Sequence, residues 1–332
     1  MSTPPTGDED ANRSEAIGSL PRRSRLLGFL VVQLLAFGSA YGAGVPTLYA
    51  GFVVVSVLVV AYVADSGAFG MLLALFGSIL VLAIGLPLAL FVARQEPALI
   101  VEQALNPAVH RMLYLSVYGP LLAAVFGVGF GVPLALLLAR GFPGQTIIES
   151  LVDLPLVVPH SAAGIIVLFG FGQGGAFPQL SVLGTMVGFV LALVFVSAPY
   201  AVNAAREAFE AVDSRMEYAA RIHGASRFET FRRVTGPLAA RGILTGGILA
   251  WARAVSEFGA VAIVAYSVSF FYPIAGRMVT TQHAPVFIRR AYLTGGLEQS
   301  GAVTFLLLAL STTVFLLIRW LAYDKATTGG IV

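Results

Sequence analysis

Long apolar stretches alternate with shorter polar ones along most of this chain of 332 residues. A helix needs about 20 mostly apolar residues to cross the hydrocarbon core of a bilayer. None of the apolar stretches shows the short alternating pattern that is typical of a membrane β-barrel. The pattern therefore predicts an all-α, polytopic membrane helix bundle. We delimit eight apolar segments at residues 26–42, 47–64, 69–93, 112–139, 154–172, 182–202, 242–268 and 301–322.

The first two segments are the shortest, and the Gly- and Pro-containing residues 43–46 that separate them suit a tight helical hairpin. Their lengths leave open a hairpin that spans the membrane and a re-entrant or interfacial one. Residues 1–25 are polar and irregular, which predicts a disordered tail. Residues 324–332 are expected to form a second, short tail.

Composition supports a membrane protein, because 58% of the residues are hydrophobic, only 11% are charged and the mean hydropathy is +0.87. The chain has no cysteine, which excludes disulfides, thiolate zinc sites and cysteine nucleophiles. Its net charge of +3 comes with no basic stripe interleaved with aromatic residues, so a nucleic-acid partner is not expected.

The arginines indicate the orientation in the membrane, because cytoplasmic loops carry an excess of positive charge. With a cytoplasmic N-terminus, fourteen Arg and Lys residues fall on the inside and five on the outside, while Arg253 lies within a segment. We therefore expect a multi-pass protein of the cell membrane with both termini in the cytoplasm.

Residues 203–241 form the one long polar stretch between apolar segments, and their pattern predicts a helix, a stop and a second helix. Gly224 can provide a left-handed helix end. Ser226 and Glu229 fit a capping box at the start of the next helix. Gly236-Pro237 is expected to end that helix near Thr235.

The expected second helix carries Phe228 and Phe231 three residues apart, which predicts an apolar edge surrounded by arginines. Two interpretations fit this makeup. The segment is either a helical ligand for a groove on a partner protein, or an amphipathic helix on the membrane surface.

Arg253 and Glu257 are four residues apart within an apolar segment, so they can form an ion pair on one helix face. Charged side chains inside a membrane are costly and mark functional candidates. The pair can fix helix packing, or Arg253 can offer its forked donors to an anion.

Pro155, Pro159 and His160 interrupt the start of the segment 154–172. Irregular backbone at membrane depth requires protein or a wet cavity beside it. The interruption either lies against such a cavity or is a kink at a cytoplasmic helix end. Asp153 is expected to cap the helix that enters the membrane.

No motif for catalysis is present. The only lysine is Lys325, so the chain contains no Gly-x-x-x-x-Gly-Lys-Ser/Thr loop for ATP. It also lacks the HExxH and GxSxG patterns, paired carboxylates and a His cluster for a metal. We expect no catalytic residue, no metal site and no cofactor in this chain.

The stretch Tyr218-Ala219-Ala220-Arg221-Ile222-His223-Gly224, followed by Val234-Thr-Gly-Pro237, resembles the EAA loop of ATP-binding-cassette (ABC) importer permeases. The alanine pair, Gly224 and Pro237 match that pattern, whereas Tyr218 replaces its glutamate, with Glu217 one place earlier. The resemblance implies that an ATPase subunit docks on residues 203–241. The implied docking residues are Glu217, Tyr218, Ala219, Ala220, Arg221, Gly224, Ser226, Phe228 and Pro237.

Two further stretches, 151–164 and 251–260, resemble segments of archaeal molybdate/tungstate permeases, which are related to sulfate permeases. The likeness implies a type I importer core of six helices over 69–323, with the typical transmembrane domain at 112–320. The hairpin 26–64 has no counterpart in that family. The implied translocation-pathway residues are Pro155, Pro159, His160, Ser161, Arg253 and Glu257.

The resemblance also implies the partners and the mechanism. A second copy of the chain, ABC ATPase subunits that bind ATP and magnesium, and an extracellular oxyanion-binding protein are expected around this permease. Molybdate or tungstate would then enter the cytoplasm by alternating access, with sulfate or another anion as the alternative. A secondary transporter driven by an ion gradient is the other alternative.

Overall fold

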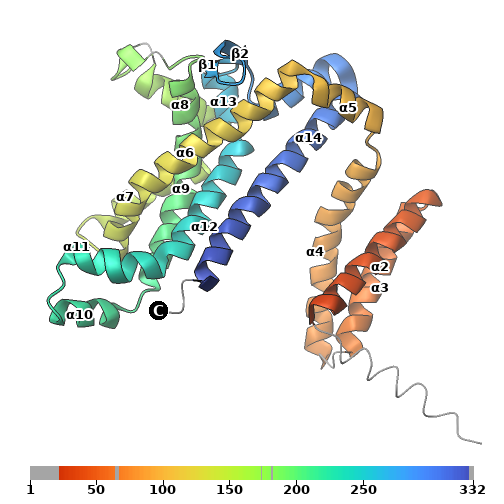
Figure 1. Cartoon of the computed structure of the whole chain (residues 1–332), viewed down its shortest axis with the longest axis horizontal. Coiled ribbons are helices and arrows are strands. Elements are labelled where there is room, and N and C mark those ends of the chain that lie inside the picture. The colour runs from red at the N-terminus through yellow and green to blue at the C-terminus, as the bar shows by residue number, and fades with distance from the viewer. Residues whose placement is uncertain (1–21, 64–66, 173, 181, 329–332) are drawn as a thin grey trace, which may run out of the picture. The chain divides into compact units, whose positions relative to one another are not determined.

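The computed structural model describes residues 22–63, 67–172, 174–180 and 182–328, and these form two compact units, 1–94 and 95–332. Each unit is described by itself (Figure 1). The expected tail over 1–25 lies outside the described residues up to position 21, and residues 22–25 already belong to a helix. The expected tail 324–332 is helical up to Thr328, and its last four residues lie outside the described residues.

The first unit consists of three helices, α2 (Arg22–Gly42), α3 (Pro46–Val63) and α4 (Gly67–Ala93). The turn between α2 and α3 is tight, and Gly44 adopts a φ of 74° in it. Gln33 Nε2 donates to Ser56 Oγ at 2.8 Å, which pairs two polar groups between α2 and α3. The predicted hairpin is therefore present. The third helix, which the sequence placed with the core at 69–93, groups with this hairpin.

The second unit contains the remaining elements. Its first half comprises α5 (Pro97–Leu105), α6 (Pro107–Arg140), α7 (Gln145–Val157), α8 (His160–Phe171), the 3₁₀ turn η1 (Pro178–Leu180) and α9 (Met186–Glu210). Its second half comprises α10 (Ser214–Ile222), α11 (Arg227–Thr230), the π-turn η2 (Phe231–Thr235), α12 (Gly236–Val255), α13 (Gly259–Val264), β1 (Val268–Tyr272), β2 (Arg277–Thr281) and α14 (Ala284–Thr328).

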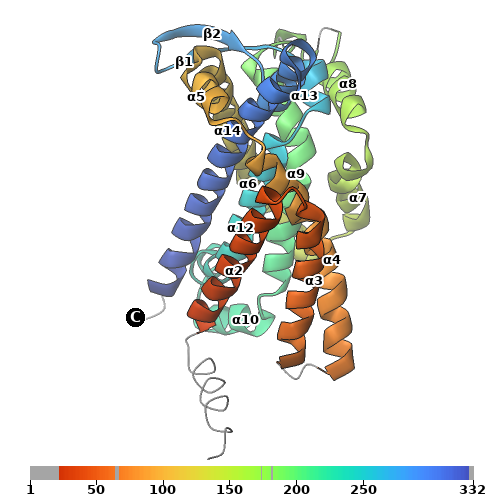
Figure 2. The ribbon, with the colours of Figure 1, turned by 90° about the vertical axis from the view of Figure 1, so that its right-hand side faces the viewer.

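The long helices α6, α9, α12 and α14 run between the two ends of this unit (Figures 1 and 2). One end carries α10 and α11, and the opposite end carries α13 and the two strands. Among the described residues, six helices of the whole chain are long and apolar enough to cross a membrane. Two shorter apolar helices, Gly28–Gly42 and His160–Phe171, complete the eight predicted segments.

Small residues let α9 pack closely against α6 and α12. A side chain at Gly246 of α12 would lie 3.1 Å from the carbonyl oxygen of Ala201 of α9. A side chain at Gly119 of α6 would collide with the ring of Phe189. Close approach of this kind replaces the hydrophobic driving force that is absent between helices in lipid.

The segment predicted as one span at 154–172 is broken between α7 and α8. Pro159 precedes α8 in an extended conformation and cannot donate a backbone hydrogen bond, so the helix ends before it. The segment predicted at 242–268 also ends early, at Val255, and its last residue, Val268, lies in a strand.

A two-stranded antiparallel hairpin, β1–β2, is an addition to the predicted all-α fold. Alternate side chains of β1 are buried, and Phe270 and Tyr272 on that face contact the ring of Tyr114 on α6. The helix after the hairpin begins at Ala284 rather than near 301. Gly296 interrupts it with a φ of 78°, which only glycine adopts readily.

Candidate functional site

The polar segment 203–241 folds as the sequence predicts through its first helix and turn. Asp213 interrupts the helical pattern and caps α10 by accepting from the amide of Arg215. Gly224 has a φ of 89°, which confirms the left-handed stop. Ser226 and Glu229 form the capping box in both directions, at 3.2 and 2.8 Å.

The outer face of this helix–glycine–helix element presents apolar side chains. Tyr218 is 68% exposed and Phe228 is 69% exposed, and Met216 and Ile222 are exposed beside them in the sequence. Exposed apolar side chains of this size are typical of a protein-binding surface. Tyr218 and Ile222 lie one turn apart on the same side of α10, and we call them, together with Phe228, the apolar face of α10–α11.

Phe231 does not contribute to this face, which corrects the prediction of a shared edge with Phe228. Its ring is half-buried and packs against Phe209 of α9, with ring centroids 6.2 Å apart. Side chains three residues apart point in directions that differ by about 60°. One of them can therefore anchor the segment on the bundle while the other remains exposed.

Glu217, the neighbour of Tyr218, holds α10 on the bundle. Its carboxylate forms an ion pair with Arg140 at the end of α6 and accepts from Thr235 Oγ1 at 2.6 Å. The Glu217 side chain is 17% exposed, so solvent only partly screens the pair. Sequence reasoning found Glu217 but missed Arg140 and Thr235, because both partners are distant in the chain.

The expected helix end at Gly236-Pro237 is wrong. The chain instead passes through the π-turn Phe231–Thr235 directly into α12. The amide of Gly236 donates to the carbonyl of Phe231, five residues back, and Pro237 stands in the first turn of α12. Proline is tolerated in a first turn because its missing donor is not needed there.

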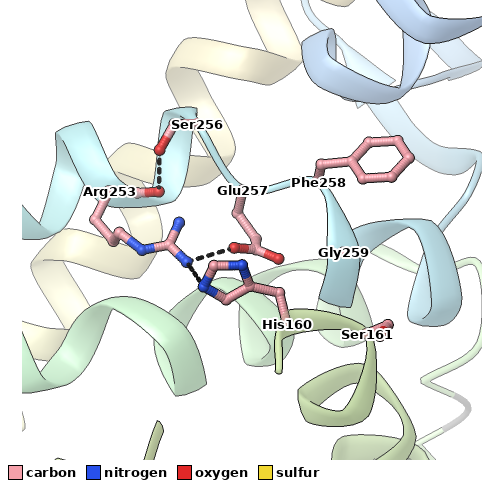
Figure 3. A pocket seen from close by; sticks show the side chains of 7 residues that line it. All are labelled: His160, Ser161, Arg253, Ser256, Glu257, Phe258 and Gly259. Carbon is pink, nitrogen blue, oxygen red and sulfur yellow. Dashed lines mark hydrogen bonds and ion pairs between the residues drawn. The ribbon is translucent and has the colours of Figure 1, made fainter. Parts of the chain in front are cut away.

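A second group of predicted residues meets at the other end of α12 (Figure 3). Arg253 Nη2 donates to Glu257 Oε2 at 2.7 Å, which confirms the predicted pair. The same nitrogen lies 2.6 Å from His160 Nε2, which accepts because arginine can only donate. Glu257 is 1% exposed and accepts the amide of Ala260 at 2.8 Å, so its charge is well compensated.

Two glycines bring His160 to this pair. A side chain on Gly259 would lie 2.7 Å from the Cβ of His160, and one on Gly164 would lie 2.8 Å from the carbonyl oxygen of Ala260. The backbones of α8 and α13 therefore touch. Because the first turn of α8 lies against Gly259, His160 reaches the guanidinium of Arg253.

These residues line an open pocket together with Ser161, Ser256 and Phe258. Both contacts of Arg253 use Nη2, and Figure 3 shows the two bonds leaving the same atom. Within the described part of the chain, Arg253 Nε and Nη1 have no hydrogen-bond partner. The guanidinium is thus fixed through one nitrogen and retains donors for an anion.

The remaining predicted pathway residues, Pro155 and Pro159, are not among the residues that line this pocket. Pro155 lies inside α7, and Pro159 directly precedes His160, the first residue of α8. The predicted capping role of Asp153 is wrong, because it lies inside α7 and accepts from Asn203 Nδ2 of α9 at 2.7 Å. The sequence singled out neither Ser256 nor Phe258, although both directly adjoin Glu257.

Among the described residues, no three His, Cys, Asp or Glu side chains are grouped to hold a metal ion. What this unit offers is an element with exposed apolar side chains, α10–α11, at one end and an anchored arginine at the other. Helix α12 joins the two, since it runs from the π-turn to the turn that carries Arg253.

Comparison with known proteins identifies relatives that match most of the chain. Residues 127–324 match the sequence model of a family described as "Binding-protein-dependent transport system inner membrane component". A molybdate/tungstate transport system permease protein of Thermococcus kodakarensis is 37% identical over 76% of this chain and 96% of its own length. A probable molybdenum ABC transporter permease protein of Haloferax volcanii is 38% identical over 74% and 87%.

A solved structure supports the same fold. The chain is similar, with a TM-score of 0.61, to a chain in the crystal structure of a bacterial ABC transporter involved in the import of the acidic polysaccharide alginate. The match covers 79% of this chain and 96% of that one, at 15% sequence identity. At this identity the likeness concerns the fold alone.

Proposed function

Because this chain belongs to the family of binding-protein-dependent transport system inner membrane components, we propose that it is the membrane-spanning subunit of an ATP-driven oxyanion importer. The chain is a multi-pass membrane protein with an all-α bundle. Molybdate or tungstate is the proposed cargo, since relatives at 37% and 38% identity are named for transport of molybdate/tungstate and molybdenum.

The observation that carries this proposal is the anchored, exposed element α10–Gly224–α11. Its apolar face is free, while Glu217 and Phe231 fix its inner side to α6 and α9. An amphipathic helix lying on lipid would not need this anchoring by an ion pair and a buried ring. The element therefore supports docking of an ATPase subunit, which supplies the ATP site that this chain lacks.

Movement of the docked ATPase would reach the transport pathway through α12. This helix has 20 residues and is about 30 Å long at 1.5 Å per residue. It begins at the π-turn beneath the docking face and carries Arg253 in its last turn. A push on α10 and α11 would thus displace Arg253 as part of one rigid element, which fits alternating access.

We place the oxyanion at Arg253 during transport. Its free Nε and Nη1 donors suit the oxygens of a tetrahedral anion, and Ser161 and Ser256 add hydroxyl groups to the same pocket. Glu257 neutralises part of the positive charge. Partial neutralisation favours transient rather than tight binding, as a pathway requires.

The proposed assembly contains two copies of this chain, two ATPase subunits and an external binding protein. The arginine-rich end with α10 and α11 faces the cytoplasm, in accord with the positive-inside rule. The strands and α13 then face outward, toward the binding protein.

The docking assignment is tested with Ala219→Glu, which places a charge on exposed α10. We expect co-purification of a co-expressed ATPase subunit to fall by about tenfold or more, because burying an unpaired charge in an interface is costly. Ala98→Glu, which adds the same charge on exposed α5 at the other end of the unit (Figure 1), serves as the control and should retain the ATPase. Equal recovery of the ATPase with both variants would refute the assignment.

A further inference from the structure

A second polar pocket lies at the end of the unit opposite to α10 and α11. It lies between the first turn of α6, the β hairpin and the first turns of α14. Its volume of about 180 Å³ is below the roughly 300–1,000 Å³ that is typical of sites for organic ligands. The polar side chains that line it are Arg111, Ser267, Thr280, Thr281, Gln282 and Arg290.

The charge of this pocket is uncompensated. Arg111 and Arg290 both line it, and no carboxylate does. Neither arginine forms an ion pair within the described residues, whereas Arg140, Arg206 and Arg253 all do. Two guanidinium groups around one small cavity repel each other unless an anion lies between them.

Gln282 adds an independent indication of a ligand. The residue is 4% exposed, it lines the pocket, and its Oε1 has no hydrogen-bond partner in the described part of the chain. A buried polar atom without a partner is costly. Because an amide can rotate by 180° and exchange its two ends, Gln282 can instead present its NH₂ donors to a bound anion.

The hydroxyl groups complete a set of donors for oxygen atoms. Ser267, Thr280 and Thr281 reach the pocket from the hairpin, and Thr280 Oγ1 is already oriented by Ser269 Oγ at 2.8 Å. Forked guanidinium donors combined with hydroxyl and amide groups are the chemistry that recognises tetrahedral oxyanions.

We propose that this pocket binds one tetrahedral oxyanion and receives it before Arg253 does. This inference rests on the proposed function. Two consecutive residues of α14 connect the two pockets. Arg290 lines this pocket, and the guanidinium of Arg289 lies over the ring of Phe258, 5.7 Å from its centroid. Phe258 in turn lines the pocket of Arg253. The free ion and the phosphate of a lipid headgroup share this chemistry, and the test separates them.

The test measures tungstate binding to the purified full-length chain in phosphatidylcholine nanodiscs by equilibrium dialysis and elemental analysis. All variants carry Arg253→Gln, so that the pocket of Arg253 does not contribute. We expect saturable binding that weakens by about tenfold or more on adding Arg111→Gln or Arg290→Gln, the usual scale for losing a charged hydrogen bond. Arg277→Gln is the matched control, because Arg277 is exposed on β2 and does not line the pocket.

Three results would overturn the proposal. The first is that tungstate does not bind saturably. The second is that tungstate binds with the same affinity after Arg111→Gln and after Arg290→Gln. The third is that Arg277→Gln weakens tungstate binding as much as the pocket substitutions do, which would indicate diffuse surface charge. In a parallel experiment, phosphatidylglycerol replaces phosphatidylcholine, and the amount of lipid that co-purifies with each variant is measured. Arg290-dependent retention of lipid without tungstate binding would assign the pocket to a headgroup and also overturn the proposal.

Failure of the tungstate-binding test can be distinguished from failure of the proposed transport function. If the pocket binds no tungstate while the ATPase still docks on α10 and α11, only this inference falls. If tungstate binds here but the ATPase does not depend on Ala219, the proposed function falls and the anion site remains.

Discussion

Arg253 is held through one of its nitrogens, and this geometry decides what the residue can do. Of the five N–H donors of a guanidinium, the two on Nη2 are directed to His160 and Glu257, which leaves three. From the sequence, Arg253 was expected either to pair with Glu257 or to contact an anion. In the structure it can do both, because the pair with Glu257 occupies only one of its nitrogens.

Arg253→Lys tests whether the free donors matter. Lysine keeps the charge and can still pair with Glu257, but it lacks the fork that binds two oxygens at once. We expect uptake of labelled molybdate by the reconstituted transporter to fall about tenfold, the scale for one charged hydrogen bond. Arg277→Lys, on the exposed strand β2, is the control. Wild-type uptake by the Arg253→Lys variant would show that the residue only fixes packing.

The residues of this site could be predicted only in part. The spacing of Arg253 and Glu257 indicated their pairing, because contacts four residues apart are local. His160 was identified as a break in an apolar segment and, through the family resemblance, as a pathway residue, but not as a partner of Arg253. Its contact with Arg253 depends on the touching backbones at Gly164 and Gly259, and a contact across 93 positions leaves no local signal in one sequence.

At the scale of elements, α10 is joined to the bundle chiefly through Glu217. The carboxylate connects α10 to the end of α6 through Arg140 and to the π-turn through Thr235. This chain has no glutamate at position 218, where the EAA pattern has one. Glu217, one position earlier, holds α10 on the bundle instead.

Glu217→Gln removes the ion pair with Arg140 and keeps an acceptor for Thr235. Stability should change by less than about 1 kcal/mol, because the pair is partly exposed to solvent. We expect the ATPase to remain bound while oxyanion uptake per ATP hydrolysed falls severalfold, since α10 would move without α6. Both quantities are measured in proteoliposomes.

Glu207→Gln is the control for this prediction. It makes the same change on an exposed residue of α9 that has no ion pair among the described residues. Unchanged coupling in the Glu217→Gln variant would contradict the proposed link from α10 to α6.

Local signals predicted most of the element at 203–241. Asp213, Gly224 and the pair Ser226 and Glu229 act on neighbouring backbone groups, so they can be read directly from the sequence. The end at Pro237 was wrong for a different reason. A π-turn continues the helix there, and its hydrogen bond from Gly236 to Phe231 is stabilised by packing of Phe231 against Phe209.

At the scale of the whole molecule, the apolar segments predicted the membrane helices because their lengths are set by the bilayer. The hairpin β1–β2 was missed, since β1 lies at the edge of a long apolar segment. The alternation of buried and exposed residues in β1 has no counterpart in its sequence, because Phe271 is exposed between the buried Phe270 and Tyr272. The helices α2 and α3 lie outside residues 127–324, which match the family model, so that model accounts for neither of them.

The energy source is a property of the whole assembly. Glu257, the carboxylate beside the central pocket, is already bonded to Arg253 and to the amide of Ala260. We therefore expect molybdate uptake by the chain reconstituted with its ATPase and binding protein to require ATP. Proton and sodium ionophores should leave the rate unchanged, and collapse of uptake on their addition would favour an ion-coupled transporter.

The π-turn at Phe231–Thr235 also has a mechanical consequence. A π-turn contains one residue more than the α-helical turn that it replaces. That residue offsets the helix positions before and after it by about 100° relative to one continuous α-helix. Because η2 lies between α11 and α12, removing one residue from Phe231–Thr235 would turn α10 and α11 to a different side of α12 without changing any of their own residues.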